Sequence, residues 1–208
     1  MYCMSDTKNI KLPDPSYHGK TSVEEAIKKR RTIRNFQKKS LKLSQLSQLL
    51  WSAQGITDDK GFMRSVPSAG ALYPLDIYVV VGEKGVEGLE PGVYHYSPRQ
   101  HIINEVCKND KRKDVARASL SQMWMANAPI ILIITAEYKR ITGKYGERGI
   151  RYAIMEVGHV AQNIFLQSES LGLGAGIVGA FYDNEVARSI NAFKNHQPLI
   201  IMPVGYKR

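Results

Sequence analysis

Three arginines and a threonine fall within five consecutive residues: Arg30, Arg31, Thr32 and Arg34. A capping box that begins at Ser22 predicts a short helix directly before them, so the cluster lies at a helix end. Guanidinium groups match phosphate oxygens with paired hydrogen bonds, and the threonine hydroxyl adds a further donor. The cluster therefore predicts an anion site. The alternative is a solvated helix end, where cations complement the helix dipole by about 0.3 kcal/mol or more each.

Two further segments are rich in small residues, which let a flat ligand approach the backbone closely. The first runs from Pro67 to Pro74, and the second, Gly172 to Phe181, has four glycines in its first eight residues. The second is not a dinucleotide-binding GxGxxG loop, because it follows a predicted helix rather than a strand. Each segment has an alternative interpretation: an ordinary loop for the first, and a tightly packed turn for the second.

The composition is that of a globular protein, with 208 residues, 43% hydrophobic and 23% charged. A net charge of +10 and a pI of about 9.6 favour an anionic partner such as nucleic acid, a membrane surface or a phosphorylated ligand. Basic residues are dense only in 28–34, 38–39 and 108–113, and no aromatic residues alternate with them. Since surfaces that bind single-stranded nucleic acid interleave the two, we expect no nucleic-acid partner.

Cysteines, histidines and apolar runs limit the other classes of function. Cys3 and Cys107 form neither a CxxC pair nor a disulfide framework, which indicates a reducing cytoplasm, and Cys107 is expected to be a small buried hydrophobe. The five histidines, His95 among them, show no ligand spacing, so we expect no metal site. The sequence start lacks a signal peptide, and the longest apolar run, 128–135, is too short to span a bilayer.

Hydrophobic periodicity predicts helices and strands without a regular βαβ alternation, which indicates an α+β fold. Residues 1–20 are interpreted as an extended arm and 21–208 as one domain. The inward faces are expected to include Val23, Ala26 and Ile27 on the first helix and Ile154 on the longest one. One predicted helix begins at residue 22. Four others are predicted over residues 44–54, 113–126, 150–171 and 183–193. The predicted strands are 77–81, 93–96, 102–106, 130–135 and 199–204.

In their order along the chain, these segments resemble the nitroreductase-like family of flavoproteins. The resemblance covers about residues 23–208, and four motifs in register make it specific: 30–36, 67–74, 172–181 and 203–208. Within the family the chain looks closest to the SagB-type branch, the thiazole/oxazole (azoline) dehydrogenases and their stand-alone relatives. That branch is indicated by LYPL at 72–75, GLEPGVYHY at 88–96 and KYGERGIRY at 144–152.

The resemblance implies a central, mostly antiparallel sheet flanked by helices, in an intertwined homodimer that holds FMN non-covalently at the subunit interface. Arg30 and Thr32 should contact the FMN phosphate, with Arg31 beside them. Lys207 or Arg208 should close on the same phosphate. No metal ion is expected in this arrangement.

The flavin ring is implied to lie between two other sets of residues. Arg34 should reach the ribityl chain and the pyrimidine edge, where a cation stabilises the anionic reduced flavin. The ring should be faced by Val178, Gly179 and Ala180, with the Gly179 N–H near N5. The other subunit should line it with Pro67, Ser68, Ala69 and Gly70. Many family members place a lysine near N1; here that stretch is Ser121 to Trp124, and Gln122 is expected to donate a neutral hydrogen bond instead.

The resemblance implies an FMN-dependent oxidoreductase in which hydride passes from NAD(P)H to the flavin and then to a small organic acceptor, nitroaromatic- or quinone-like. The alternative is azoline-to-azole oxidation on a modified peptide. Lys144 and Tyr145 are similar to a pair that azoline dehydrogenases use on the substrate side, and a surface loop pair is the other interpretation. Rivals from other classes are a basic nucleic-acid-binding module and a non-catalytic flavin-binding protein.

Overall fold

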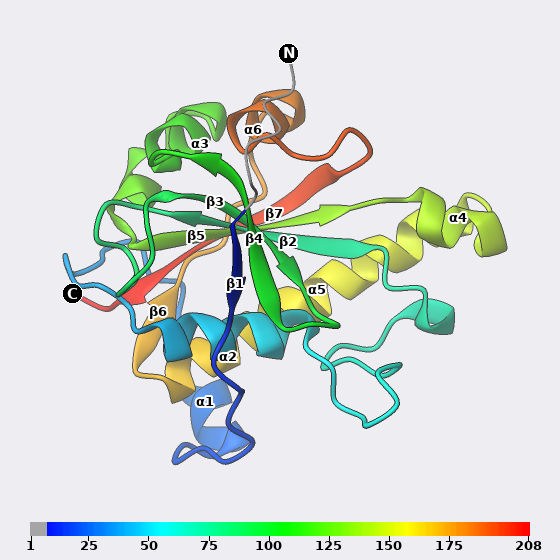
Figure 1. The fold of residues 1–208 in the computed structure, drawn as a ribbon, viewed down its shortest axis with the longest axis horizontal. Helices are drawn as coiled ribbons and strands as arrows, with labels where there is room; N and C mark the ends of the chain where they lie inside the picture. Colours follow the sequence, from blue (N-terminus) through cyan, green and yellow to red (C-terminus); the bar gives the residue numbers. More distant parts are fainter. Residues whose placement is uncertain (1–7) are drawn as a thin grey trace.

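The computed structural model describes residues 8–208, and Cys3 and the first part of the expected arm lie outside them (Figure 1). Seven strands form one antiparallel sheet in the order β1-β4-β3-β2-β5-β7-β6. The strands are β1 (Asn9–Lys11), β2 (Leu75–Val81), β3 (Gly92–Ser97), β4 (Ile102–Lys108), β5 (Ile130–Ala136), β6 (Leu173–Ala175) and β7 (Gln197–Tyr206). The helices are α1 (Val23–Lys29), α2 (Leu43–Gln54), α3 (Arg112–Ala118), α4 (Lys139–Tyr145), α5 (Arg148–Ser170) and α6 (Asp183–Ser189), with short 3₁₀ turns η1 (Ala69–Ala71) and η2 (Met123–Asn127).

Helices cover both faces of the sheet. Figure 1 shows α1, α2 and α5 below it, and α3 and α6 above it. The larger hydrophobic cluster joins one face to α2 and α5, and the smaller one joins the other face to α3, η2 and α6. The central strands β2 and β5 are buried almost throughout, as expected for strands packed on both faces. The predicted α+β class is therefore confirmed.

Local signals explain where several elements begin and end. The Ser22 hydroxyl accepts a hydrogen bond from the Glu25 N–H at 3.1 Å, which confirms the predicted helix start. Gly55 follows the last residue of α2, as predicted, and Gly172 follows α5 with a φ of 69°. At the N-terminal end of the domain, β1 pairs with β4, so the expected arm contributes an edge strand.

Three details of the predicted helices were wrong. Val23, Ile27 and Ile154 were expected to be buried, but each side chain is more than half exposed, whereas Ala26 is buried. The helix predicted over 113–126 ends at Ala118, because the chain turns through positive φ angles at residues 120 and 121 and resumes as η2. The helix predicted to reach residue 193 ends at Ser189.

Candidate functional site

The arginine cluster lies in an extended segment held between two strands at one end of the sheet. Arg30 ends α1, with its N–H bonded to the Ala26 carbonyl at 2.9 Å. Thr32 then forms a parallel bridge with Ala175 of β6. A few residues later, Phe36 bridges the C-terminal Lys207, and the Arg208 N–H donates to the Asn35 carbonyl at 3.3 Å. The residues predicted to contact the FMN phosphate, which come from both ends of the chain, therefore lie together.

The three arginines of the cluster differ in their surroundings. The Arg30 guanidinium lies 5.3 Å from the centre of the Phe165 ring, and that of Arg34 lies 5.8 Å from the Trp124 ring. Within residues 8–208 neither of them pairs with a carboxylate. Arg31 instead folds back and donates to two carbonyls at the end of α1. Arg30 and Arg34 are thus the guanidiniums left for an anion, whereas Arg31 stabilises the helix end.

The glycine-rich segment serves two purposes along its length. A Cβ added at Gly174 would lie 2.6 Å from Ile33, and one at Gly176 would lie 2.7 Å from Trp124, so these glycines allow close packing against the arginine segment. A Cβ at Gly179 would meet nothing within 4 Å. The backbone there faces open space, which is the property that a flat ligand requires.

Gln122 lies beside this open backbone, and the C-terminus lies further along β7. The Gln122 side-chain amide donates to the Ala180 carbonyl at 3.3 Å, so two residues expected beside the same ring do lie together. Val178 is buried and pairs with Ile201 of β7. Lys207 forms an ion pair with Glu169 at 2.5 Å, which offsets part of its charge. Arg208 is the more exposed of the two C-terminal cations.

The loop that was predicted to line the flavin from the other subunit, Pro67 to Gly70, lies just before β2 and is anchored to α5. The Ser68 hydroxyl donates to Glu156 at 2.6 Å and accepts from the Tyr73 N–H at 2.9 Å. Gly70 has a φ of 63°, a left-handed conformation that favours glycine. Pro67 and Gly70 are exposed. The loop is therefore exposed on its outer side and is held by the hydrogen bonds of Ser68 on its inner side.

Glu156 is the centre of a polar network that the sequence analysis missed. Its carboxylate accepts from Ser68 and, at 3.3 Å, from the Gln54 amide, whose oxygen accepts from Arg64 at 2.9 Å. Burial raises the pKa of Glu156, although both hydrogen bonds act in the opposite direction. A signal was present: Glu156 falls three residues after Ala153 and four before Val160, on the buried stripe of α5.

Lys144 and Tyr145, predicted on the substrate side, lie at the end of α4 against the Ser68 loop. A Cβ added at Gly70 would be 2.7 Å from the Tyr145 hydroxyl and 3.1 Å from the Lys144 ammonium. The Tyr145 ring also packs edge-on against Tyr152, with 5.2 Å between ring centres. The structure thus brings the substrate-side pair and one predicted flavin-lining loop into contact.

The arginine segment with the C-terminus and the loop of residues 67–70 lie at opposite ends of the same strands (Figure 1). Strand β5 begins beside β7 and β6, with Ile130 paired to Val204, and ends at Ala136, paired to Leu75. Seven residues of strand separate the groups by roughly 20 Å. Gly179 lies between these two ends, because Val178 bridges Ile201, which pairs with Ile133 in the middle of β5.

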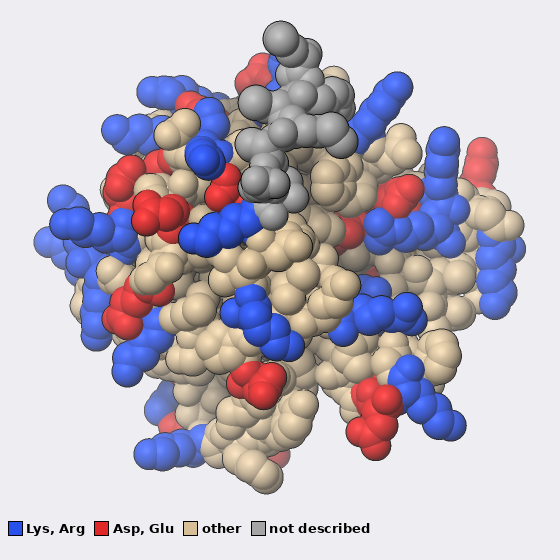
Figure 2. Space-filling model, in the orientation of Figure 1, with Lys and Arg blue, Asp and Glu red and all other residues tan. Residues whose placement is uncertain are grey.

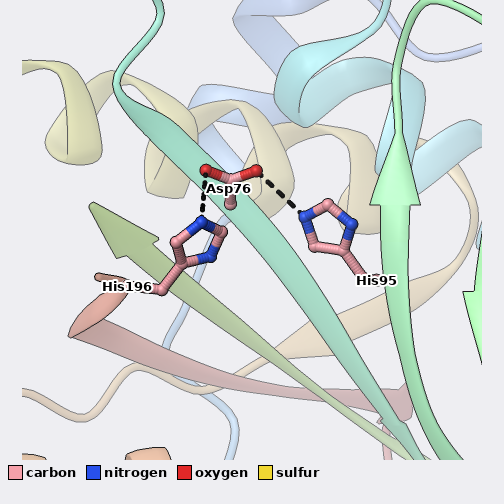
Figure 3. Close-up of side chains that lie close together, drawn as sticks. All are labelled: Asp76, His95 and His196. Carbon is pink, nitrogen blue, oxygen red and sulfur yellow. Dashed lines mark hydrogen bonds and ion pairs between the residues drawn. The ribbon is translucent and has the colours of Figure 1, made fainter. Parts of the chain in front are cut away.

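The histidines are arranged differently from the expectation. His95 and His196 point at the same carboxylate, that of Asp76 (Figure 3). The expectation that the histidines form no ligand-like cluster was therefore wrong for these two. Strand pairing places Asp76 diagonally across from His95, and the loop before β7 brings His196 to them. None of these placements is visible in the linear sequence.

A model of the nitroreductase family matches residues 27–206 of the chain. The chain belongs to this family. The match includes the arginine segment, both glycine-bearing segments and all of the sheet except β1. Family membership supports an oxidoreductase in general.

Individual relatives agree with this assignment. The chain is 50% identical over 204 residues to a nitroreductase-type protein of Methanocaldococcus jannaschii, which covers 98% of this chain and 99% of the relative. It is 27% identical to the microcin B17-processing protein McbC of Escherichia coli, over 81% of this chain and 63% of McbC. A nitroreductase-type crystal structure from Ralstonia eutropha superposes with a TM-score of 0.84 at 25% identity, covering 96% of this chain and 90% of that one. The McbBCD microcin synthetase complex gives 0.75 at 27% identity, covering 84% and 67%.

Proposed function

We propose that this protein is an FMN-dependent oxidoreductase that takes hydride from NAD(P)H and passes it to a small organic acceptor, nitroaromatic- or quinone-like. The observation that carries the proposal is the arginine segment: within residues 8–208, Arg30 and Arg34 pair with no carboxylate, and the segment bridges β6 a few residues before the open Gly179 backbone. A phosphate at one end and a flat ring at the other fit this donor set. The bound flavin would supply the redox chemistry, and the protein would bind and orient it.

We assign the phosphate to Arg30, Thr32 and the C-terminal cations. Arg30 and Thr32 lie on the segment fixed by β6, so their donors are held in place before any ligand binds. Arg208 is exposed and lies beside this segment, whereas Lys207 shares its charge with Glu169. Arg31 contributes mainly through its positive charge, because its guanidinium donates to the end of α1.

We assign the ring side to Arg34, Gln122 and the backbone from Val178 to Ala180. Arg34 is exposed and would stabilise negative charge on a reduced flavin, since a fixed cation favours the anionic form. The Gly179 N–H would donate to the ring without a side chain in the way. Gln122 already donates to Ala180 and would supply a neutral donor where a lysine is common in the family.

We further propose that a homodimer completes the site, with residues 67–70 of the partner subunit lining the ring. Two observations support this: the arginine segment and residues 67–70 lie at opposite ends of β5, and Val23, Ile27 and Ile154 expose apolar surface on the α1–α5 side. Mixing two inactive variants, Arg30→Glu and Ser68→Trp, tests it. Random exchange of subunits should restore about a quarter of the sites, because each heterodimer has one site with both halves intact. No recovery after confirmed subunit exchange would contradict the shared site.

The second candidate function is oxidation of an azoline to an azole on a modified peptide. The contact of Lys144 and Tyr145 with Gly70 favours it, because it places a potential base and a phenol beside the predicted flavin-lining loop. The relatives McbC and TfxB are named as microcin- and trifolitoxin-processing proteins. Here Lys144 would take the proton that leaves the azoline ring, and the hydride would pass to the flavin.

The deciding experiment is an absorbance spectrum of the purified protein, followed by anaerobic addition of NADH or NADPH. A yellow protein that is bleached by a nicotinamide and recovers with a quinone or nitroaromatic supports the leading proposal. Bleaching by an azoline peptide, but not by nicotinamides, favours the second candidate. A yellow protein that no donor reduces indicates flavin storage.

A colourless protein that cannot be reconstituted with FMN would refute both enzyme proposals. Steeply salt-dependent binding of DNA or RNA by that protein would then indicate the nucleic-acid-binding module. The face shown in Figure 2 does not favour that outcome, since its lysines and arginines are spread apart with acidic residues between them.

Two arginine variants separate the assigned roles. Arg30→Ala should weaken FMN binding, whereas Arg34→Ala should also lower the flavin reduction potential, because it removes the cation next to the developing charge. Equal effects on affinity with no change in potential would contradict the division.

We also propose a cytoplasmic location, which the cysteine content supports. Among residues 8–208, no helix is long and apolar enough to cross a membrane.

A further inference from the structure

One cluster of ligand-type side chains lies outside every residue assigned to the flavin. Asp76 of β2, His95 of β3 and His196, just before β7, meet on the α6 side of the sheet (Figure 3). One ligand atom from each lies within 4.8 Å of the other two. The three residues come from segments far apart in the sequence, and the rigid central strands hold two of them.

The carboxylate of Asp76 is only partly satisfied by its neighbours. Its Oδ1 lies 2.9 Å from the Nε2 of His95, in a hydrogen bond. Its Oδ2 is buried, lies 2.7 Å from the Nη1 of Arg140 in an ion pair without the geometry of a hydrogen bond, and lies 3.6 Å from the Nε2 of His196. The Asp76 side chain is 10% exposed. The charge of this buried oxygen is therefore balanced by Arg140, a partly exposed side chain that a bound cation would have to displace.

Both imidazoles are oriented by contacts on their far sides. The Nδ1 of His196 bonds to the Tyr78 hydroxyl at 2.9 Å, and that hydroxyl also accepts the Phe193 N–H at 3.1 Å. The Phe193 ring packs edge-on against both imidazoles, with 5.2 Å between ring centres in each case. The Nε2 atoms of both histidines are thereby aimed at Asp76. A hydrogen bond that fixes the second ring nitrogen is a usual feature of histidines that bind metals.

We propose that Asp76, His95 and His196 bind one divalent transition-metal ion of the Zn²⁺ type. Two imidazole nitrogens and one carboxylate oxygen are a common three-ligand set for zinc, with a fourth position left for water. Ligand bonds of about 2.0–2.1 Å require the donor atoms to be a little over 3 Å apart, so the cluster has to contract by about 1.5 Å at most. In the bound state Nε2 of each histidine is the unprotonated ligand atom and Nδ1 carries the imidazole proton, so that Nδ1–H of His196 donates to the Tyr78 hydroxyl.

Arg140 competes with the ion for Asp76. Its Nη1 lies 2.7 Å from Oδ2, while its Nε pairs with Glu137 at 2.6 Å. The side chain is about one-third exposed, so it can move outward and keep Glu137 as its partner. Replacement of this cation by a neutral group should strengthen metal binding, because it removes a positive charge from the ligand carboxylate.

The test is a titration of the chelator-treated, full-length protein with Co²⁺ or Zn²⁺ alone. Cobalt bound by nitrogen and oxygen gives visible bands, whereas cobalt bound by cysteine also gives strong near-ultraviolet absorption, so binding at Cys107 is recognised. The variants are His95→Gln, His196→Gln and Arg140→Gln, and the matched control is His18→Gln, which changes an exposed histidine outside the cluster.

We expect one ion per chain for the wild type and the control, at least tenfold weaker binding for each cluster histidine variant, and several-fold tighter binding for Arg140→Gln. Circular dichroism checks that each variant is folded, and the arginine variant, which leaves all three ligands in place, tests the site even if a histidine variant unfolds. Absence of stoichiometric binding by the wild type, or unchanged affinity in the arginine and histidine variants, would overturn the proposal. None of these readouts depends on flavin.

Discussion

Replacing the buried Glu156 by leucine should lower the free energy of unfolding by about 2 kcal/mol and loosen the 67–70 loop. Ser68 and Gln54 both donate to this carboxylate, at 2.6 and 3.3 Å, and the residue is only 2% exposed. Leucine leaves the buried Gln54 amide and the half-buried Ser68 hydroxyl without this acceptor, at about 1–3 kcal/mol for a buried donor and less for the half-buried one. Part of this cost is offset, because the variant no longer buries a carboxylate, which gives the net value of about 2 kcal/mol.

Glu156→Gln separates the charge from the shape of the side chain. The amide oxygen can accept from one of the two donors, but its NH₂ group then faces the other. One hydrogen bond is lost while the volume is kept, so the expected loss is about 1 kcal/mol at neutral pH. The leucine variant should therefore be the less stable of the two.

The pH dependence of the unfolding free energy tests the role of Glu156 independently. Burial raises the pKa of Glu156 above its ordinary value of 4.5, so the folded state binds this proton more tightly than the unfolded state does. Stability from this group therefore rises as the pH falls from above the raised pKa towards 4.5. The glutamine variant lacks this gain, and the stability difference between wild type and variant should grow as the pH falls.

Urea unfolding at one fixed protein concentration measures these differences, since the stability of an oligomer depends on concentration. The control is Glu185→Gln, which changes an exposed glutamate on α6 and should alter stability by less than about 0.5 kcal/mol. If Glu156→Leu unfolds like the wild type, or if the difference for Glu156→Gln does not change with pH, the network does not hold the loop as described.

Three further substitutions test local features. Ser22→Ala removes the cap of α1 and should cost about 1 kcal/mol in urea unfolding, and an unchanged midpoint would show that α1 does not need it. Gly70→Ala places an L residue at a φ of 63° and a methyl group 2.7 Å from the Tyr145 hydroxyl; it should cost about 1–2 kcal/mol and reduce turnover more than flavin affinity. Ile154→Glu puts a charge on the exposed apolar side of α5 and should shift the mass measured by light scattering from dimer to monomer; a dimer that persists would place the interface elsewhere.

The sequence predicted those elements whose signals are local and long enough. Helices α2 and α5 have sustained apolar stripes, and β2, β5 and the β3–β4 hairpin are apolar runs bounded by turn residues. Helix α4 was missed because only Ile141 of its seven residues is buried, which leaves no stripe to detect. Strand β6 is three residues long and owes its extended form to pairing with β7, so its sequence alone carries little information.

In the candidate site, motifs that occupy one short stretch could be recognised in the sequence. Clusters formed by residues from distant segments could not. The arginine cluster, residues 67–70 and the glycine-rich segment each occupy one short stretch, so residue types and spacing marked them. The side chains around Asp76 come from three distant segments, and only the strand register brings them together. The exposure of Val23, Ile27 and Ile154 likewise could not be predicted, because an apolar stripe does not reveal whether its partner belongs to the same chain.

Helix α5 fixes the distance between the two parts of the proposed site. Near its start Glu156 anchors Ser68, and near its end Phe165 packs under Arg30 and Glu169 pairs with Lys207. Thirteen residues of helix between Glu156 and Glu169 correspond to about 20 Å, which matches the length of strand β5 between the same two groups. Because one rigid helix holds both the 67–70 loop and the arginine segment, small movements of a single chain cannot bring that loop to the arginine segment. A second chain can present its own 67–70 loop to the arginine segment of the first chain. The exposed apolar residues of α1 and α5 lie on the helices that would form the contact between two such chains.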